Sequence, residues 1–435
     1  MPDPSRVAPG VTTPTTDERR ALDAVDFDWQ LGLLGRMLAL RSDQGNESAM
    51  QRLMAATMSD IGMEVDAWEI DLETLRHDPH HSEEIHRTEA LGVVGTYGSG
   101  AGPTLALNGH VDVVGPGVET DWTQPIWELT VAEGCAYGRG AVDMKGSMSC
   151  ALAAIRALRT AGVAIAGTIA VQSVVGEEDG GTGTLATIRR GHRADAAIVL
   201  EPTELQIATA HCGALCFRVR VRGLSAHACM RDEGVSAIAK AGVLLGTLDA
   251  LEARRNARVD HQLLAVHANP LPISVGTIHG GEWPSSVPTE CSFKMRVGFF
   301  PGIKPVEIRE AVLKCINDAA AGKPGMNDNP PVVEFIGFQA EGCTIDPEEA
   351  MMQMMADVHT RVTGRDPVYA STTATTDARF FNLYGNIPAT CYGPEASHIH
   401  GIDESLGLES FKEVTRVLAV FLAEWCGTEP LVRKS

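Results

Sequence analysis

The chain has 435 residues, of which 44% are hydrophobic, so it is long enough for two or three domains with a sizeable core. Its formal net charge is −20, from 56 acidic and 36 basic side chains, which disfavours nucleic acid and anionic membrane surfaces as partners. We find neither a secretory leader pattern nor an apolar run of membrane-spanning length. We therefore expect a globular, cytoplasmic protein.

The ten cysteines are scattered singly through apolar segments and form no C-x-x-C pair. Their spacing does not match that of a structural zinc site built on cysteine. The pattern favours buried free thiols, which are typical of cytosolic proteins.

The order of the predicted elements indicates an α/β fold. We expect residues 1–20 to form a flexible tail, followed by amphipathic helices over residues 29–40 and 49–62. Strands and helices then alternate, which is typical of a sheet joined by crossover helices. The alternating segments are the strands 104–114, 167–175 and 195–202 and the helices 146–162 and 183–191.

The pattern changes at Cys212. Residues 216–223 alternate apolar and basic side chains, which is typical of an antiparallel strand with one face in solvent. Further strands are predicted over 272–281, 290–300 and 330–338, and helices over 236–251 and 304–321. We interpret residues 213–338 as an inserted α+β unit and residues 21–212 with 339–435 as the surrounding domain, whose last helix covers Glu409–Trp425.

Titratable side chains stand at the ends of the predicted sheet strands. They are His110 and Asp112 in strand 104–114, Asp143 in a glycine-flanked loop before a helix, Glu177 and Glu178 after strand 167–175, Glu201 after strand 195–202, and His400 beyond a strand at 386–394. In open α/β sheets, ligands bind at the carboxyl ends of the strands. We therefore expect these side chains to converge.

Converging carboxylates repel one another unless a cation neutralises them. Two histidines and three carboxylates can hold two divalent ions with one carboxylate bridging, and two ions about 3.5–4 Å apart can activate one water. Adjacent residues after a strand diverge, so one acid of the Glu177–Glu178 pair can bind metal while the other reaches the water as a general base. In an alternative interpretation the pair is a solvated turn and Glu201 caps a helix.

Five motifs carry these residues: "LALNGHVDVV", "GRGAVDMKG", "VVGEEDGGTG", "AIVLEPT" and "HIHGIDES". In sequence and order they resemble those of the dinuclear-zinc amidohydrolases of the M20 peptidase family, the group of acetylornithine deacetylase and succinyl-diaminopimelate desuccinylase. The resemblance runs from about Trp29 to the C-terminus. It implies a catalytic domain with a mixed sheet flanked by helices, an inserted α+β lid and dimerisation domain, and a homodimer.

The resemblance also implies roles for the site residues. His110, Asp143 and Glu201 would hold one metal ion, and Asp143, Glu178 and His400 would hold the other, with Asp143 bridging. Glu177 would deprotonate the bridging water and protonate the leaving amine, and Asp112 would orient His110. His398 is an alternative to His400. The ligands would suit zinc first, and also cobalt or manganese.

Two residues of the inserted unit complete the implied site. In "GLSAHA", His227 would reach the active site of the partner subunit and stabilise the oxyanion. In "KMRVGFFPG", Arg296 would grip a substrate carboxylate. Many relatives carry an asparagine directly before the "VP" of "WPSSVP", where this chain has Ser286. This departure argues against a close substrate analogy.

These features predict a metal-dependent hydrolase of a C–N bond in a small, carboxylate-bearing substrate, with an N-acyl amino acid deacylase as the first choice. A dipeptidase or carboxypeptidase is the second choice, and a hydrolase of an unusual amine or amide is the third. The alternative that is not an enzyme is a relative that binds metal or amino acid without catalysis, as a sensor or scaffold. The histidines between His77 and His86 suggest a metal tract, but an exposed polar loop is the favoured interpretation.

Overall fold

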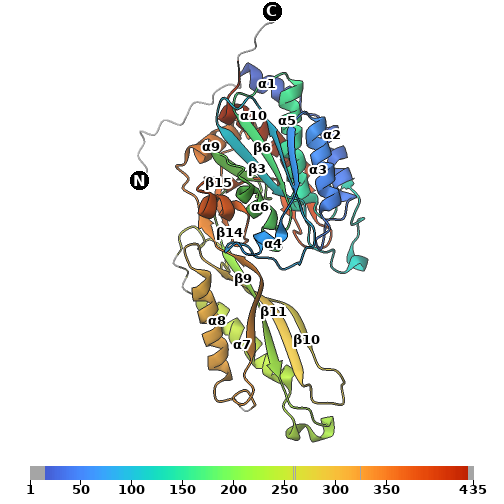
Figure 1. The fold of residues 1–435 in the computed structure, drawn as a ribbon, viewed down its shortest axis with the longest axis vertical. Coiled ribbons are helices and arrows are strands. Elements are labelled where there is room, and N and C mark those ends of the chain that lie inside the picture. The colour runs from blue at the N-terminus through green and yellow to red at the C-terminus, as the bar shows by residue number, and fades with distance from the viewer. Residues whose placement is uncertain (1–14, 258, 260, 324, 430–435) are drawn as a thin grey trace, which may run out of the picture.

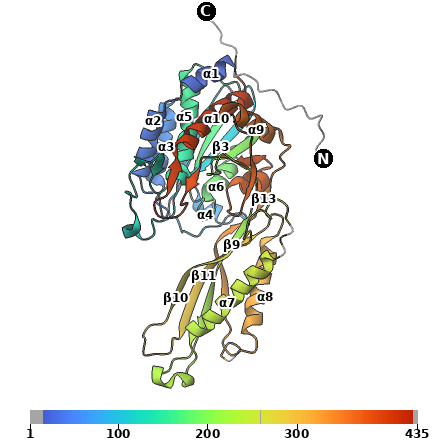
Figure 2. The same cartoon turned by 180° about the vertical axis from the view of Figure 1, so that it is seen from behind.

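The computed structural model describes residues 15–429 except 258, 260 and 324, and it has two bodies, a broad α/β domain and an elongated lid (Figures 1 and 2). The α/β class and the inserted lid predicted from the sequence are confirmed. Most of the tail expected over residues 1–20 lies outside the described residues. Its last part is helical, because Thr15 caps the first helix and accepts a hydrogen bond from the backbone N–H of Glu18.

Ten helices are described in this part of the chain. They are α1 (Thr16–Asp23), α2 (Phe27–Leu38), α3 (Ser48–Asp60), α4 (Leu72–Leu75), α5 (Gly146–Thr160), α6 (Thr182–Arg190), α7 (Ala237–Asn256), α8 (Pro305–Ala320), α9 (Ala350–Thr363) and α10 (Leu408–Cys426). Four short helical segments are η1 (Glu119–Asp121), η2 (Ala141–Lys145), η3 (Ala228–Glu233) and η4 (Phe380–Gly385). Among the described residues, no helix combines the length and the apolar composition that a membrane crossing needs.

The α/β domain is built on a mixed six-stranded sheet. In spatial order its strands are β1 (Glu64–Glu69), β2 (Leu91–Tyr97), β6 (Thr168–Val174), β3 (Thr104–His110), β7 (Ala196–Val199) and β15 (Ala389–Cys391). β6, β3, β7 and β15 are parallel to one another, whereas β2 runs antiparallel to both of its neighbours, β1 and β6. The carboxyl ends of β3, β6 and β7 therefore meet at one edge of the sheet.

Helices cover both faces of this sheet (Figure 1). On β3, a Cβ added at Gly109 would meet the side chain of Met148 on α5, whereas the next side chain, Asn108, donates a hydrogen bond to Thr184 on α6. Neighbouring residues of a strand point to opposite faces, so α5 and α6 lie on opposite sides of the sheet.

Two small sheets complete the α/β domain. One contains β13 (Cys343–Thr344), β8 (Ile207–His211) and β14 (Tyr369–Thr372); the other contains β16 (Ala396–Ser397), β17 (Ser405–Gly407), β5 (Cys135–Tyr137) and β4 (Thr130–Ala132). The second sheet anchors the segment that carries His400, which lies between β16 and β17.

The lid is a four-stranded antiparallel sheet with two helices. Its strands are ordered β10 (Ile273–Gly280), β11 (Glu290–Phe299), β9 (Gly213–Arg222) and β12 (Val332–Ala340). Alternate side chains of β9 and β11, such as Phe217 and Phe293, are buried in an apolar cluster with Val312 of α8. This cluster is separate from the core of the α/β domain. The lid therefore has its own core.

Candidate active site

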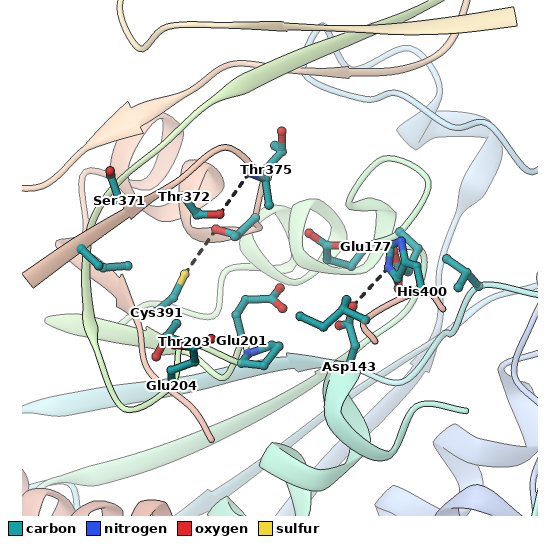
Figure 3. A pocket seen from close by; sticks show the side chains of 18 of the residues that line it. Asp143, Glu177, Glu201, Thr203, Glu204, Ser371, Thr372, Thr375, Cys391 and His400 are labelled. Carbon is teal, nitrogen blue, oxygen red and sulfur yellow. Dashed lines mark hydrogen bonds and ion pairs between the residues drawn. The ribbon is translucent and has the colours of Figure 1, made fainter. Parts of the chain in front are cut away.

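The structure brings most of the predicted site residues to the carboxyl ends of the central strands. His110 is the last residue of β3, Glu177 and Glu178 follow β6, and Glu201 follows β7. Asp143 joins them from η2, and His400 from the segment between β16 and β17. Figure 3 shows Asp143, Glu177 and His400 near one another, with Glu201 between them and a group of hydroxyl side chains.

Asp143 lies between the two histidines. Its Oδ1 is 3.0 Å from Nε2 of His110, and its Oδ2 is 3.2 Å from Nε2 of His400. The same His400 nitrogen lies 3.0 Å from Oε1 of Glu178. Asp143 and His110 are buried, whereas half of the His400 side chain is exposed to the cavity side. His398, the alternative to His400, does not line the cavity described below.

Two groups of three side chains could each hold a metal ion, because within each group the ligand atoms all lie within 4.8 Å of one another. One consists of His110, Asp143 and Glu178, and the other consists of His110, Glu177 and Glu201. Nitrogen and oxygen ligands lie about 2.0–2.2 Å from zinc, so either group is compact enough to contact one ion. The second group differs from the ligand set that the family resemblance implies for the first metal ion, His110, Asp143 and Glu201, because it contains Glu177 instead of Asp143.

The electrostatics of the cluster fit cations. Burial, with the nearby carboxylates of Asp377 and Glu201, raises the pKa of Glu177 well above its usual value, and one buried oxygen of Glu177 has no hydrogen-bond partner. Burial and the carboxylate of Asp143 raise the pKa of Glu201 to about 8. Such raised values reflect acids that lack a compensating positive charge. Divalent ions would supply that charge, so the residues present fit a metal centre.

The histidines show the opposite effect. Burial alone would lower the pKa of His400, but hydrogen bonding with Asp143 and Glu178 raises it to about 11. Burial would also raise the pKa of Asp143, whereas its hydrogen bonds with His110 and His400 lower it. The carboxylates thus favour the protonated, positively charged form of His400.

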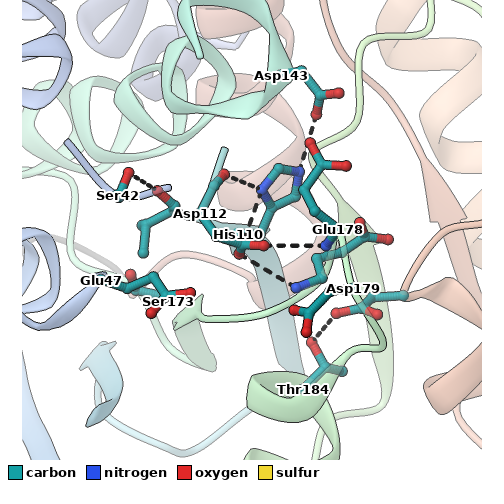
Figure 4. A network of polar contacts seen from close by, with 12 residues as sticks. Ser42, Glu47, His110, Asp112, Asp143, Ser173, Glu178, Asp179 and Thr184 are labelled. Carbon is teal, nitrogen blue, oxygen red and sulfur yellow. Dashed lines mark hydrogen bonds and ion pairs between the residues drawn. The ribbon is translucent and has the colours of Figure 1, made fainter. Parts of the chain in front are cut away.

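Asp112 holds two parts of the site together, but through unexpected atoms. The Nδ1–H of His110 can donate to the backbone carbonyl of Asp112 at 2.9 Å, whereas the Asp112 carboxylate is 3.7 Å from this nitrogen. The carboxylate accepts hydrogen bonds from the backbone N–H groups of Glu177 at 3.3 Å and Glu178 at 3.1 Å (Figure 4). Asp112 therefore positions both the imidazole and the turn after β6.

Two buried ion pairs that the sequence interpretation missed support the same elements. Arg139 pairs with Glu404 at 2.6 Å, and Oε1 of Glu404 accepts the backbone N–H of Asp143 at 3.2 Å. Arg87 contacts Asp179, the residue after Glu178, at 2.7 Å. Glu404 belongs to the motif that contains His400. Its position four residues after that histidine was the sequence signal that could have indicated its role in supporting the site.

A cavity of about 680 Å³ opens above the cluster, between the catalytic domain and the lid. Its walls combine the carboxylates and His400 with hydroxyl-bearing and small side chains, namely Thr203, Ser371, Thr372, Thr375, Thr376, Ala208, Ala370, Ala374 and Cys391. Arg296 of β11 also lines it and donates a hydrogen bond to Oγ1 of Thr375 at 3.2 Å. The structure thus places Arg296 in the cavity that contains the acidic cluster.

His227 lies elsewhere. It precedes η3 in the lid, its ring accepts a hydrogen bond from the backbone N–H of Cys229 at 3.1 Å, and it is not among the described residues that line the cavity. Within one chain, the structure therefore does not bring His227 to the cluster.

Comparison with known proteins identifies the family. Residues 106–424 match the profile of the family described as peptidase family M20/M25/M40. The chain belongs to this family. As an M20 enzyme it is a metal-dependent hydrolase, which confirms the resemblance found in the motifs.

Two curated M20 relatives are similar over most of their length. Both are named N-formyl-4-amino-5-aminomethyl-2-methylpyrimidine deformylase. The protein from Halalkalibacterium halodurans is 27% identical over 88% of this chain and 90% of its own. The protein from Bacillus subtilis is 25% identical over 88% of this chain and 90% of its own. Among solved structures, the dipeptidase Dug1p from Saccharomyces cerevisiae is 15% identical, with a TM-score of 0.75 over 94% of this chain and 98% of that chain. This last likeness shows that the two proteins share the M20 fold.

Proposed function

We propose that the protein is a dinuclear metal-dependent amidohydrolase that removes a short acyl group from an N-acylated amine. The observation that carries this proposal is the convergence of His110 with four carboxylates at the base of one cavity. Family membership supports hydrolysis of an amide, and the names of the two curated relatives support a formyl group as the acyl part.

The proposed metal ligands are those expected from the motifs. One ion would lie among His110, Asp143 and Glu201, and the other among Asp143, Glu178 and His400. The position of Asp143 between the two imidazoles supports its bridging role. Bound divalent ions would polarise the scissile carbonyl and lower the pKa of the attacking water. Zinc is our first choice for this nitrogen and oxygen ligand set, and cobalt and manganese are alternatives.

Glu177 is the proposed general base. It is buried, it lines the cavity, and its backbone is fixed by Asp112. A carboxylate in this position would take a proton from water as the hydroxyl adds to the carbonyl carbon of the substrate. It would then give the proton to the nitrogen as the C–N bond breaks. The products are a carboxylate and a free amine.

The amine part of the substrate has two candidates. Arg296, whose guanidinium lines the cavity, supports an N-acyl amino acid, since it could bind the carboxylate. The curated relatives, which are named deformylases of an aminomethylpyrimidine, support an acylated heteroaromatic amine. The dipeptidase among the solved structures shares only the fold, so a peptide substrate is the weaker choice.

We also propose a homodimer in which each lid supplies His227 to the other subunit. Apolar side chains exposed along the outer edge of the lid support this assembly, namely Ile278 of β10, Trp283 beyond it and Ile238 of α7. The exposed position of His227, outside the cavity of its own chain, fits a role across a two-fold interface. The free state of all ten cysteines supports a cytoplasmic location.

The direct test is a substrate screen of the purified protein after chelation and reloading with zinc, cobalt or manganese. N-formyl and N-acetyl derivatives of amino acids and of 4-amino-5-aminomethyl-2-methylpyrimidine would be compared with dipeptides, and release of the amine would be measured. We expect turnover of at least one N-acyl compound, lost with chelator and restored by metal. Tight metal binding without turnover of any of them would favour the non-catalytic alternative.

A further inference from the structure

The loop between α4 and β2 has no place in the proposed metal centre, yet it forms part of the cavity wall. This loop, residues 76–90, contains the histidines that the sequence suggests as a metal tract. In the structure three of them make separate contacts: His77 bonds to the carbonyl of Glu73, His86 pairs with Glu83, and His80 stacks on the ring of Tyr384 at 3.8 Å. The member of the loop that lines the cavity is Glu84.

The loop is held firmly to the turn that carries Glu177 and Glu178. The buried guanidinium of Arg87 contacts Asp179 at 2.7 Å and is also paired with Glu47 at 2.6 Å. In addition, the Asp179 carboxylate accepts the backbone N–H of Ile85 at 2.8 Å, and the Asp179 carbonyl accepts that of Glu84 at 2.9 Å. The backbone of Glu84 is therefore fixed relative to the proposed base.

The same loop also contacts the lid. The hydroxyl of Ser82 bonds to both backbone groups of Gln339 on β12, at 3.1 and 3.2 Å. A Cβ added at Gly337 would lie 2.8 Å from Cγ of Glu84, so the glycine leaves the space that the Glu84 side chain occupies. Glu84 thus stands where the two domains meet over the cavity.

The Glu84 carboxylate is available to a ligand. No hydrogen bond or ion pair within the described part of the chain uses it, and its side chain is exposed. It lies near Cys216: burial, with the charge of Glu84 as the next cause, raises the pKa of this cavity-lining thiol to about 11. Cys216 is the strand partner of Arg296, so the acid and the guanidinium lie on the same side of the cavity.

The charges of this outer wall favour a substrate with a positive or hydrogen-donating group. Apart from the proposed ligands and base, the charged residues lining the cavity are Glu84, Glu204 and Arg296. Two acids and one guanidinium leave a net charge of −1 when all are ionised, and the guanidinium already donates to Thr375. An ammonium or amino group placed against an unpaired carboxylate forms a charge-assisted hydrogen bond.

We propose that Glu84 is a specificity-determining residue that binds an amino or ammonium group on the amine part of the substrate. The proposal rests on the amidohydrolase function given above, and it names the class of amine that the site prefers. Such an amine carries a second nitrogen group distant from the acylated one.

Three substrates of equal chain length test this preference. N-Formylputrescine carries a terminal ammonium, N-pentylformamide a methyl group, and 5-formamidopentanoate a carboxylate. With the metal-loaded enzyme, we expect kcat/KM to be highest for the ammonium compound. In Glu84→Gln, kcat/KM for that compound should fall by about 10- to 100-fold, the range of one hydrogen bond to a charged group. The value for the neutral compound should stay within about twofold of that of the unchanged enzyme.

Glu204→Gln is the matched control, since Glu204 is the other cavity carboxylate outside the proposed metal centre. It should leave the ranking of the three substrates unchanged. An equal loss for all three substrates in Glu84→Gln would assign Glu84 a structural role and overturn the proposal. A change of ranking in Glu204→Gln alone would transfer the recognition to Glu204.

Binding can be measured without turnover. In a Glu177→Gln background, calorimetric titration should give tighter binding of N-formylputrescine than of N-pentylformamide, and Glu84→Gln should remove the difference. This measurement separates the two proposals, because a lack of turnover of every N-formyl and N-acetyl compound would refute the function while the binding preference still reports on Glu84. Equal affinities with and without Glu84 would overturn the specificity assignment.

Discussion

The carboxylate of Asp112 accepts a hydrogen bond from the backbone N–H of Glu178, 3.1 Å away, across the space between β3 and β6. The same residue accepts from His110 through its backbone carbonyl. The side chain of Asp112, two residues beyond β3, therefore fixes the turn after the neighbouring strand, and the Asp112 backbone fixes the imidazole. The two functions can be separated by mutation, because only the first depends on the carboxylate.

Asp112→Asn should reduce kcat while leaving most of the metal in place. The amide offers one acceptor to two N–H groups and presents an NH₂ group to one of them, so the turn carrying Glu177 and Glu178 is displaced. We expect a loss of about 10- to 100-fold, the scale for residues that orient a metal site. Metal content and turnover would be measured together. Asp121→Asn, an exposed aspartate in η1, is the control, and unchanged turnover in Asp112→Asn would contradict this role.

The adjacent glutamates should respond differently to the same substitution. Glu177→Gln should keep both metals and lose at least about 100-fold in turnover, because a proton carrier is removed. Glu178→Gln should lose metal, because its carboxylate faces His400. Elemental analysis of the two variants distinguishes them. Metal loss in Glu177→Gln would instead support the group in which Glu177 joins His110 and Glu201.

His227→Ala tests the dimer and the oxyanion role together. We expect full metal content and a loss of about 100- to 1,000-fold, corresponding to about 2.7–4 kcal/mol for one oxyanion donor. Mixing with Asp143→Ala chains under subunit exchange should restore about a quarter of the normal activity. Half of the dimers are then mixed, and each mixed dimer has one complete site. No recovery after proven exchange would place His227 outside catalysis or within its own subunit.

Arg87→Met should destabilise the fold strongly. Arg87 is buried between Glu47 and Asp179, and removal of the guanidinium leaves two buried carboxylates without a partner. The free energy of unfolding in urea should fall by about 3–5 kcal/mol. Lys314→Met provides the comparison, since Lys314 pairs with Asp318 at 2.6 Å and both side chains are exposed; its loss should lower the free energy of unfolding far less. Equal effects would show that the buried network contributes no more than a surface pair.

Local pattern was sufficient to predict the position of the central site residues. An apolar run that ends in a carboxylate or an imidazole marks a strand end, and parallel strands bring such ends together, as for His110, Glu178 and Glu201. The first helix also had a local signal: Thr15 and Glu18 have the spacing of a capping box, and the prediction of a tail through residue 20 overlooked it.

Supporting contacts between distant parts of the chain could not be predicted in the same way. Glu404 is 261 positions from Asp143, and Arg87 is 92 positions from Asp179. In sequence, charged residues such as Arg87 are indistinguishable from surface residues, and only the tertiary structure shows that they are buried. The sequence also cannot tell which oxygen of Asp112 meets His110, because this depends on how the chain turns after β3.

The strands that enter and leave the lid are neighbours, with Ala214 of β9 paired to Ala340 of β12. The two crossing points of the chain are therefore only one strand spacing apart, about 5 Å. A hairpin loop of about two to five residues would rejoin the chain there if the lid were excised. The lid of another family member could likewise be transplanted between these two alanines without altering the connectivity of the central sheet. The metal centre and the cavity wall that carries Arg296 of β11 could then be exchanged as separate modules in chimaeric enzymes.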